Sequence, residues 1–98
     1  MNTLNRTDEF DAWLYGLKDL NARAKVLVRI RRAEQGNFGD CTPVGQGVSE
    51  MRIDHGPGYR VYLAQEGRVV YLLLCAGDKS TQKADIKRAK AIWKQLQG

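Results

Sequence analysis

The feature that most constrains the fold of this 98-residue chain is a segment that indicates two β-strands joined by a tight turn. The turn is the Gly-Pro-Gly sequence at residues 56–58, and the residues on both sides of it largely alternate between polar and apolar. Successive side chains of a strand point to opposite faces, so this alternation gives each strand one apolar and one polar face. We therefore expect residues 45–63 to form a hairpin within an antiparallel sheet.

The polar face of this hairpin carries the candidate functional residues. Glu50 and Arg52 share one face of the first strand, and Arg60 and Tyr62 share one face of the second. One surface then gathers a carboxylate, two guanidinium groups and a phenol. Because a guanidinium pairs with two phosphate oxygens at once, such a surface suits a phosphodiester.

Each of these residues also has an ordinary structural interpretation. Charges on strands are usually solvated on the outer face of a sheet, which would account for Glu50 and Arg52. Arg60, next to the Gly-Pro-Gly turn, is less ordinary, and Tyr62 fits packing as well as chemistry. His55 lies in the turn beside this surface; imidazole titrates near neutral pH, although a lone loop histidine is usually just exposed.

Length and charge limit the classes of function. The chain is long enough for one domain with one modest core, so we expect a single domain over residues 1–98 and no cofactor. Sixteen Lys and Arg residues against eleven Asp and Glu residues give a net charge of +5. This excess favours an anionic partner, which means nucleic acid, the ribosome or an acidic protein.

The cysteine and histidine content predicts no metal site. Cys41, Cys75 and His55 are scattered, whereas a structural zinc site needs four such ligands at close spacing. Cys75 lies in an apolar run and is expected to be a buried thiol, although its spacing from Cys41 leaves a disulfide open. The chain begins with no apolar signal-peptide core and has no apolar run of about 20 residues. We therefore expect a cytoplasmic protein with no membrane partner.

Two helices are predicted in the first third of the chain. Thr7 is a suitable cap for the first, and Asp19 for the second, which is expected to end at Gly36. A very short connection between them indicates an antiparallel helical hairpin. The apolar positions that recur at helical spacing are Phe10, Trp13, Leu14, Leu17, Ala22, Val26, Ile30 and Ala33.

The rest of the chain indicates a loop, a covered strand and a last helix. The glycine-rich segment 36–47 is predicted to be a loop and a candidate binding edge. Residues 68–76 are apolar on both faces, as in a strand covered on both sides, and a helix follows from Ser80 or Thr81 to about Gln97. The expected fold is α+β: an antiparallel sheet of three to four strands with an N-terminal helical hairpin and a C-terminal helix. The fourth strand would be residues 2–6, which are poor strand formers.

Two rows of basic side chains lie on the predicted helices. The second helix carries Lys25, Arg29 and Arg32, and the last helix carries Lys83, Lys87, Lys90 and Lys94. Such rows are most often solvated helix faces. If they bind RNA, the affinity should fall as the salt concentration rises.

Short segments along nearly the whole chain carry a resemblance to a known family. They are Phe10–Leu14, Leu17–Asp19, Gly36–Asp40, Pro43–Val48, Gly56–Tyr62, Gly77–Gln82 and Asp85-Ile86. In this order they resemble the RelE/ParE superfamily of bacterial toxins, and most closely its phage-derived HigB-like group of addiction-module killer proteins. The resemblance implies a RelE-like fold and the toxin of a type II toxin-antitoxin system, held as a hetero-oligomer by a cognate antitoxin.

The resemblance also implies a mechanism and a set of catalytic residues. RelE-like members cleave mRNA in the ribosomal A site, which makes a ribosome-dependent, metal-independent endoribonuclease that inhibits translation the leading interpretation. In this interpretation Arg60 binds the phosphate, and Arg52 or Lys79 makes a second contact. Glu50 is the general base or orients Arg52. The candidate substrate contacts, including those to ribosomal RNA, are Tyr62, His55, Lys83, Lys25, Arg29 and Arg32.

One departure from the family leaves two alternatives open. Several ribosome-dependent members carry a His or Tyr near the C-terminus as general acid or base, and here no His or Tyr follows Tyr71. The first alternative is a non-enzymatic inhibitor of DNA gyrase, as in ParE-like members. The second is a degenerate toxin that only binds its antitoxin.

Overall fold

A computed structural model describes all 98 residues of the chain. Its elements are β1 (Thr3–Arg6), α1 (Asp8–Gly16), α2 (Leu20–Glu34), β2 (Cys41–Gly45), β3 (Val48–Ile53), β4 (Tyr59–Gln65), β5 (Val70–Asp78), a 3₁₀ turn (Lys79–Thr81) and α3 (Gln82–Leu96). None of the helices combines the length and the apolar character that spanning a bilayer requires.

The five strands form one mixed sheet in the order β1-β5-β4-β3-β2. β1 pairs parallel to β5, and the other neighbours pair antiparallel. The predicted α+β class and C-terminal helix are confirmed. The predicted sheet of three to four antiparallel strands is wrong, because the sheet has five strands and one parallel pair.

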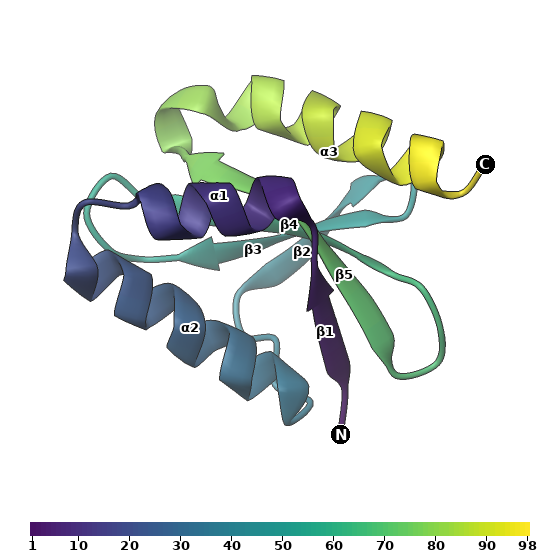
Figure 1. Cartoon of the computed structure of the whole chain (residues 1–98), viewed down its shortest axis with the longest axis horizontal. Helices are drawn as coiled ribbons and strands as arrows, with labels where there is room; N and C mark the ends of the chain where they lie inside the picture. The colour runs from purple at the N-terminus through teal and green to yellow at the C-terminus, as the bar shows by residue number, and fades with distance from the viewer.

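Helices cover both faces of the sheet. In Figure 1, α1 and α2 lie on one side of the sheet and α3 lies on the other. The core under α1 and α2 includes Phe10, Leu14, Val26 and Ile30, and a second core under α3 includes Trp93. Alternation along β3 and β4 therefore sends one set of side chains toward α1 and α2 and the other set toward α3.

The two N-terminal helices match the predicted hairpin only roughly. Both predicted caps are confirmed, since Thr7 Oγ1 accepts from the Phe10 amide and Asp19 Oδ1 accepts from the Asn21 and Ala22 amides. From their short connection the helices diverge, as Figure 1 shows. Each packs mainly on the sheet, α1 on β5 and α2 on β1 and β3.

Two strands form where composition disfavours them. β1 is held by its parallel pairing with β5, and Asn2 next to it donates to the carbonyl oxygens of Glu34 and Ala33. β2 lies within the segment predicted to be a loop, so that prediction is wrong for Cys41–Gly45. Pro43 is tolerated there because β2 is an edge strand, where a missing N–H need not cost a ladder hydrogen bond.

The buried thiol predicted at Cys75 is confirmed, and neither cysteine forms a disulfide. Burial raises the pKa of the Cys75 thiol to about 12, because the thiolate is disfavoured away from water. Since the thiolate is the reactive form, we expect iodoacetamide at pH 8 to modify Cys75 more slowly than an exposed cysteine by on the order of 10³-fold. A mass-spectrometric time course measures the rate, with the urea-unfolded protein as control. Equal rates in the folded and unfolded protein would contradict the burial.

Candidate functional site

Three cations predicted as catalytic meet at one cavity of about 330 Å³. Arg52 comes from β3, Arg60 from β4, and Lys79 from the turn after β5. The strand register explains the meeting, since Arg52 pairs with Arg60, and Arg60 pairs with Gly77 just before Lys79. We call this cavity the arginine cleft; it is lined by Asp40, Arg52, Ile53, Asp54, Gly58, Tyr59, Arg60 and Lys79.

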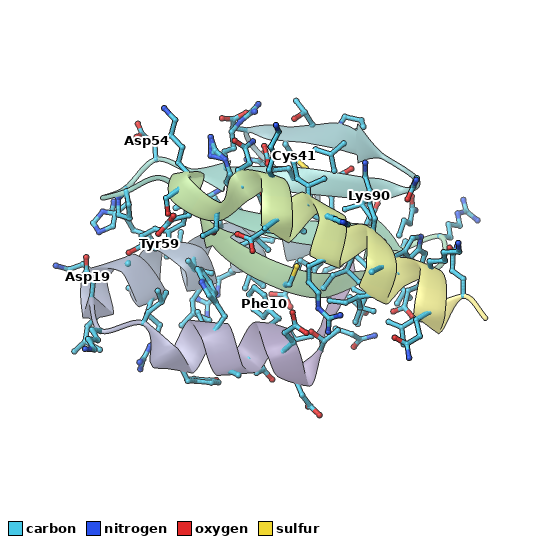
Figure 2. The ribbon with its side chains drawn as sticks, turned by 90° about the horizontal axis from the view of Figure 1, so that it is seen from above. Phe10, Asp19, Cys41, Asp54, Tyr59 and Lys90 are labelled. Atoms are coloured by element: carbon cyan, nitrogen blue, oxygen red, sulfur yellow. The ribbon has the colours of Figure 1, made fainter.

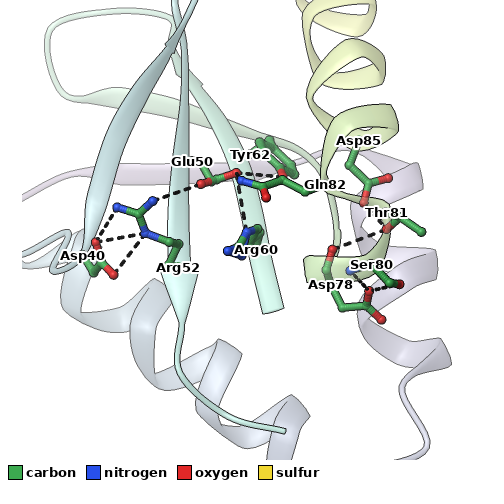
Figure 3. Close-up of polar contacts among 10 residues, drawn as sticks. All are labelled: Asp40, Glu50, Arg52, Arg60, Tyr62, Asp78, Ser80, Thr81, Gln82 and Asp85. Atoms are coloured by element: carbon green, nitrogen blue, oxygen red, sulfur yellow. Dashed lines mark hydrogen bonds and ion pairs between the residues drawn. The ribbon is translucent and has the colours of Figure 1, made fainter. Parts of the chain in front are cut away.

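Glu50 is buried, with 1% of its surface exposed, and contacts both arginines. Its Oε1 lies 3.4 Å from Arg52 Nη1, and its Oε2 lies 3.8 Å from Arg60 Nε. Oε2 also accepts hydrogen bonds from the Tyr62 hydroxyl and the Gln82 side-chain amide, each at 3.0 Å (Figure 3). Two cations and two neutral donors therefore offset the cost of burying this carboxylate.

The burial of Glu50 follows from the packing of α3. Alternation correctly placed Glu50 and Tyr62 on one face, and these two residues are paired across β3 and β4. α3 covers this face, and its first residue, Gln82, reaches Glu50. The interpretation of Glu50 as a solvated outer-face charge is therefore wrong. Of the two roles predicted for Glu50, general base or orientation of Arg52, the second fits its burial better.

The two arginines of the cleft differ in how fully they are paired. Arg52 donates to both carboxylate oxygens of Asp40, at 3.0 to 3.2 Å, in addition to its contact with Glu50. Its guanidinium lowers the pKa of the Asp40 carboxyl, so Asp40 is ionised at neutral pH. The Arg60 side chain is 13% exposed, and its Nε has no hydrogen-bond partner. Of the two arginines, Arg60 is thus the one with unused donors beside the cleft.

Lys79 is exposed on the 3₁₀ turn that follows β5. The turn is held by Asp78, whose Oδ1 accepts from the Ser80 amide at 2.8 Å, and by Thr81, whose hydroxyl donates to Asp85. Because no ion pair involves Lys79, its charge faces the cleft without an acidic partner.

Gly77 is required by the close packing at this turn. A Cβ at Gly77 would overlap the Asp85 carboxylate. We expect Gly77→Ala to lower the free energy of unfolding by about 1–3 kcal/mol, as overpacking does. Urea denaturation measures the change. Gly67→Ala is the matched control, because a Cβ at Gly67 would meet nothing closer than 3.8 Å; equal effects of the two substitutions would contradict this account.

Two other predicted contacts lie apart from the cleft surface. Tyr62 has none of its surface exposed, and burial and then its hydrogen bond to Glu50 raise the pKa of the phenol, which stays protonated. His55 Nε2 lies 3.2 Å from Asp19 Oδ2, and the ring stacks on Tyr59 rather than lining the cleft. Figure 2 shows Asp19, Asp54 and Tyr59 at one end of the molecule, with Lys90 toward the other.

The basic row of α2 borders a second cavity of about 370 Å³, lined in part by Lys25, Arg29 and Arg32. Ile53 and Asp54 line both this cavity and the arginine cleft, so the two hollows adjoin. The Arg29 guanidinium donates to backbone carbonyl oxygens of the β3 and post-α2 segments and is already engaged.

Lys83 lies outside the cavities, exposed in the first turn of α3. The structure therefore does not bring Lys83 together with the other predicted contacts. No group of three or more His, Cys, Asp or Glu side chains is arranged to hold a metal ion.

Three residues of the site were absent from the sequence prediction: Asp40, Asp54 and Gln82. Asp40 lies in the segment 36–47 that was predicted to be a binding edge, and Asp54 follows Arg52 at the spacing of two that alternation favours. These two signals were available. Gln82 had no such signal, because its contact with Glu50 depends on how α3 packs.

Comparisons with known proteins identify the family of this chain. The family model described as phage-derived protein Gp49-like matches residues 12–96. A Haemophilus influenzae protein described as uncharacterized is 52% identical over 93 residues, which cover 95% of this chain and 94% of that protein. The chain therefore belongs to the Gp49-like phage-derived family, a toxin-like family related to RelE and HigB.

Proposed function

We propose that this protein is a single toxin domain of a type II toxin-antitoxin system and acts in the cytoplasm as a ribosome-dependent, metal-independent mRNA endoribonuclease. The observation that carries the proposal is the arginine cleft. Arg52, Arg60 and Lys79 reach it from three separate elements, with the Glu50 carboxylate buried behind the two arginines. Membership of the Gp49-like family is compatible with a toxin.

The cleft supplies one of the three things that RNA cleavage by the 2′-hydroxyl requires, which is charge stabilisation. The reaction needs an acceptor for the 2′ proton, positive charge against the phosphorane, and a donor for the leaving 5′ oxygen. Arg60 contacts the phosphate with its guanidinium, whose Nε makes no hydrogen bond within the protein, and Lys79 makes the second contact. Arg52, fixed by Asp40 and Glu50, adds positive charge that need not reorganise during the reaction.

The cleft offers few side chains that could act as the general acid and general base of the reaction. Asp54 lines the cleft and has no ion pair, so it is the carboxylate placed to accept the 2′ proton. No imidazole lines the cleft. The one phenol that lines it belongs to Tyr59, which is only 9% exposed. We propose that the ribosome completes the proton transfers, which makes cleavage ribosome-dependent.

The proposal includes two kinds of partner. A cognate antitoxin neutralises the toxin within a hetero-oligomer, as family membership favours. Ribosomal RNA contacts exposed cations outside the cleft, which are Lys25 and Arg32 of α2 and Lys83 of α3. These contacts should weaken as the salt concentration rises.

Induction of the protein in growing bacteria tests the proposal against its alternatives. We expect growth arrest with an early loss of radiolabelled methionine incorporation and without a DNA damage response. Arg60→Ala should cause neither the growth arrest nor the loss of incorporation. Arrest with a DNA damage response and intact mRNA would contradict the proposal and indicate a gyrase inhibitor. Unimpaired growth at a confirmed level of folded protein would indicate a degenerate toxin.

A further inference from the structure

The missing hydrogen bond of the Arg60 Nε atom needs an explanation. Its Nε is buried 3.8 Å from Glu50 Oε2 and has no hydrogen-bond partner. A guanidinium this close to a buried carboxylate normally closes the gap and forms a short charge-assisted hydrogen bond. Arg52, the neighbouring arginine, does form such bonds, to Asp40.

Two neutral donors occupy the carboxylate oxygen that Arg60 faces. The Tyr62 hydroxyl and the Gln82 amide both donate to Glu50 Oε2 at 3.0 Å, from β4 and from the start of α3 (Figure 3). A carboxylate oxygen has two lone pairs, and these two bonds use both. The other oxygen, Oε1, faces Arg52.

We propose that Tyr62 and Gln82 are positioning residues that occupy Oε2 of the Glu50 carboxylate, the oxygen facing Arg60, and thereby leave the Arg60 guanidinium free to bind a phosphate group. The inference rests on the proposed function, because it describes how the same cleft binds its phosphodiester. Glu50 attracts Arg60 strongly enough to hold it at the cleft, while the two donors prevent the shorter contact that would compete with phosphate. Gln82 contributes without touching RNA.

Salt-dependent binding of a single-stranded 2′-O-methyl RNA oligonucleotide tests this inference, because such RNA cannot be cleaved through its 2′ oxygen. In the Tyr62→Phe/Gln82→Met double variant, Arg60 is expected to close onto Glu50. The affinity should then fall about tenfold, and the slope of log affinity against log salt should shrink by about 0.7, the loss of one phosphate contact. Arg60→Ala gives the reference for that loss. The matched controls are Tyr71→Phe and Gln65→Met, which lie outside the cleft and should change neither quantity.

A third substitution separates positioning from a general loss of structure. Adding Glu50→Gln to the double variant removes the charge that captures Arg60, so we expect the affinity to return toward the wild-type value. The Arg60 Nε–H resonance should move downfield in the double variant and return in the triple variant. If the double variant does not fold, Gln82→Met alone should give part of the loss, because this side chain is only partly buried.

Three outcomes would overturn the inference. They are a double variant that binds like the wild type, a loss that Glu50→Gln does not reverse, and an Arg60→Ala variant of unchanged affinity. These measurements need no catalysis. A protein that shows the expected binding pattern but cleaves no mRNA would therefore refute the proposed nuclease while supporting the positioning roles.

Discussion

Replacing Arg60 with alanine is expected to slow mRNA cleavage by about 10²–10³-fold, the loss typical when one donor to a developing oxyanion is removed. Arg60 lies at the arginine cleft, and when its side chain is removed Glu50 keeps its contacts with Arg52, Tyr62 and Gln82. Single-turnover cleavage on programmed ribosomes measures the chemical step apart from binding.

Two further variants make the Arg60 result specific. Arg68→Ala is the matched control, because Arg68 is exposed in the turn between β4 and β5 and lines no part of the cleft. Arg60→Lys should recover only part of the rate, since an ammonium group lacks the planar pair of donors. An Arg60→Ala protein that cleaves at the wild-type rate would show that this arginine does not stabilise the transition state.

Replacing Glu50 with alanine is expected to lower the free energy of unfolding by about 3 kcal/mol, the low end of the cost of breaking a buried ion pair. The substitution leaves the Tyr62 hydroxyl and the Gln82 amide without their acceptor, and leaves Arg60 beside a cavity without a counter-charge. Urea denaturation followed by circular dichroism measures the change.

The exposed glutamate of the β4–β5 turn provides the comparison for Glu50. Glu66 is exposed and forms no ion pair, so Glu66→Ala should change the free energy of unfolding by less than about 0.5 kcal/mol. Glu50→Gln keeps an acceptor for both neutral donors and should cost less than Glu50→Ala. A Glu50→Ala protein as stable as Glu66→Ala would contradict the buried network.

The hairpin shows how far sequence alternation can predict this fold. The alternation correctly assigned these side chains to opposite faces of the sheet. Met51 and Ile53 pack under α1 and α2, whereas Glu50 and Tyr62 pack under α3. The apolar run of β5 was correctly predicted to be covered on both faces. Local periodicity suffices in these cases because each strand pairs with a neighbour close in sequence.

β1 and β2 show where local signals fail. Thr3–Arg6 becomes a strand through parallel pairing with β5, a partner more than sixty residues away that local propensity cannot reveal. Cys41–Gly45 contains Pro43 and Gly45, which favour a turn, and forms a strand because β3 offers an open edge. Pairing with a neighbouring strand therefore decides both elements, at long range for β1 and across a tight turn for β2.

The candidate site likewise contains residues that the sequence predicts and contacts that depend on long-range packing. The sequence located Arg52 and Arg60 on one face, and the resemblance to RelE-like toxins singled out Lys79; all three line the cleft. Alternation assigned Glu50 to this face but gave no sign that a helix covers it. The covering helix brings Gln82 to Glu50 and buries this carboxylate beside the two arginines instead of leaving it exposed.

The most direct test of the proposed function is 5′-end mapping of a reporter mRNA in a purified translation reaction, with and without ribosomes, using the wild type and Arg60→Ala. We expect new 5′ ends in register with the reading frame, produced only when ribosomes and Arg60 are both present. The proposed endoribonuclease activity would be contradicted if the mRNA stays intact with ribosomes and wild-type protein present, while the same protein arrests growth in cells.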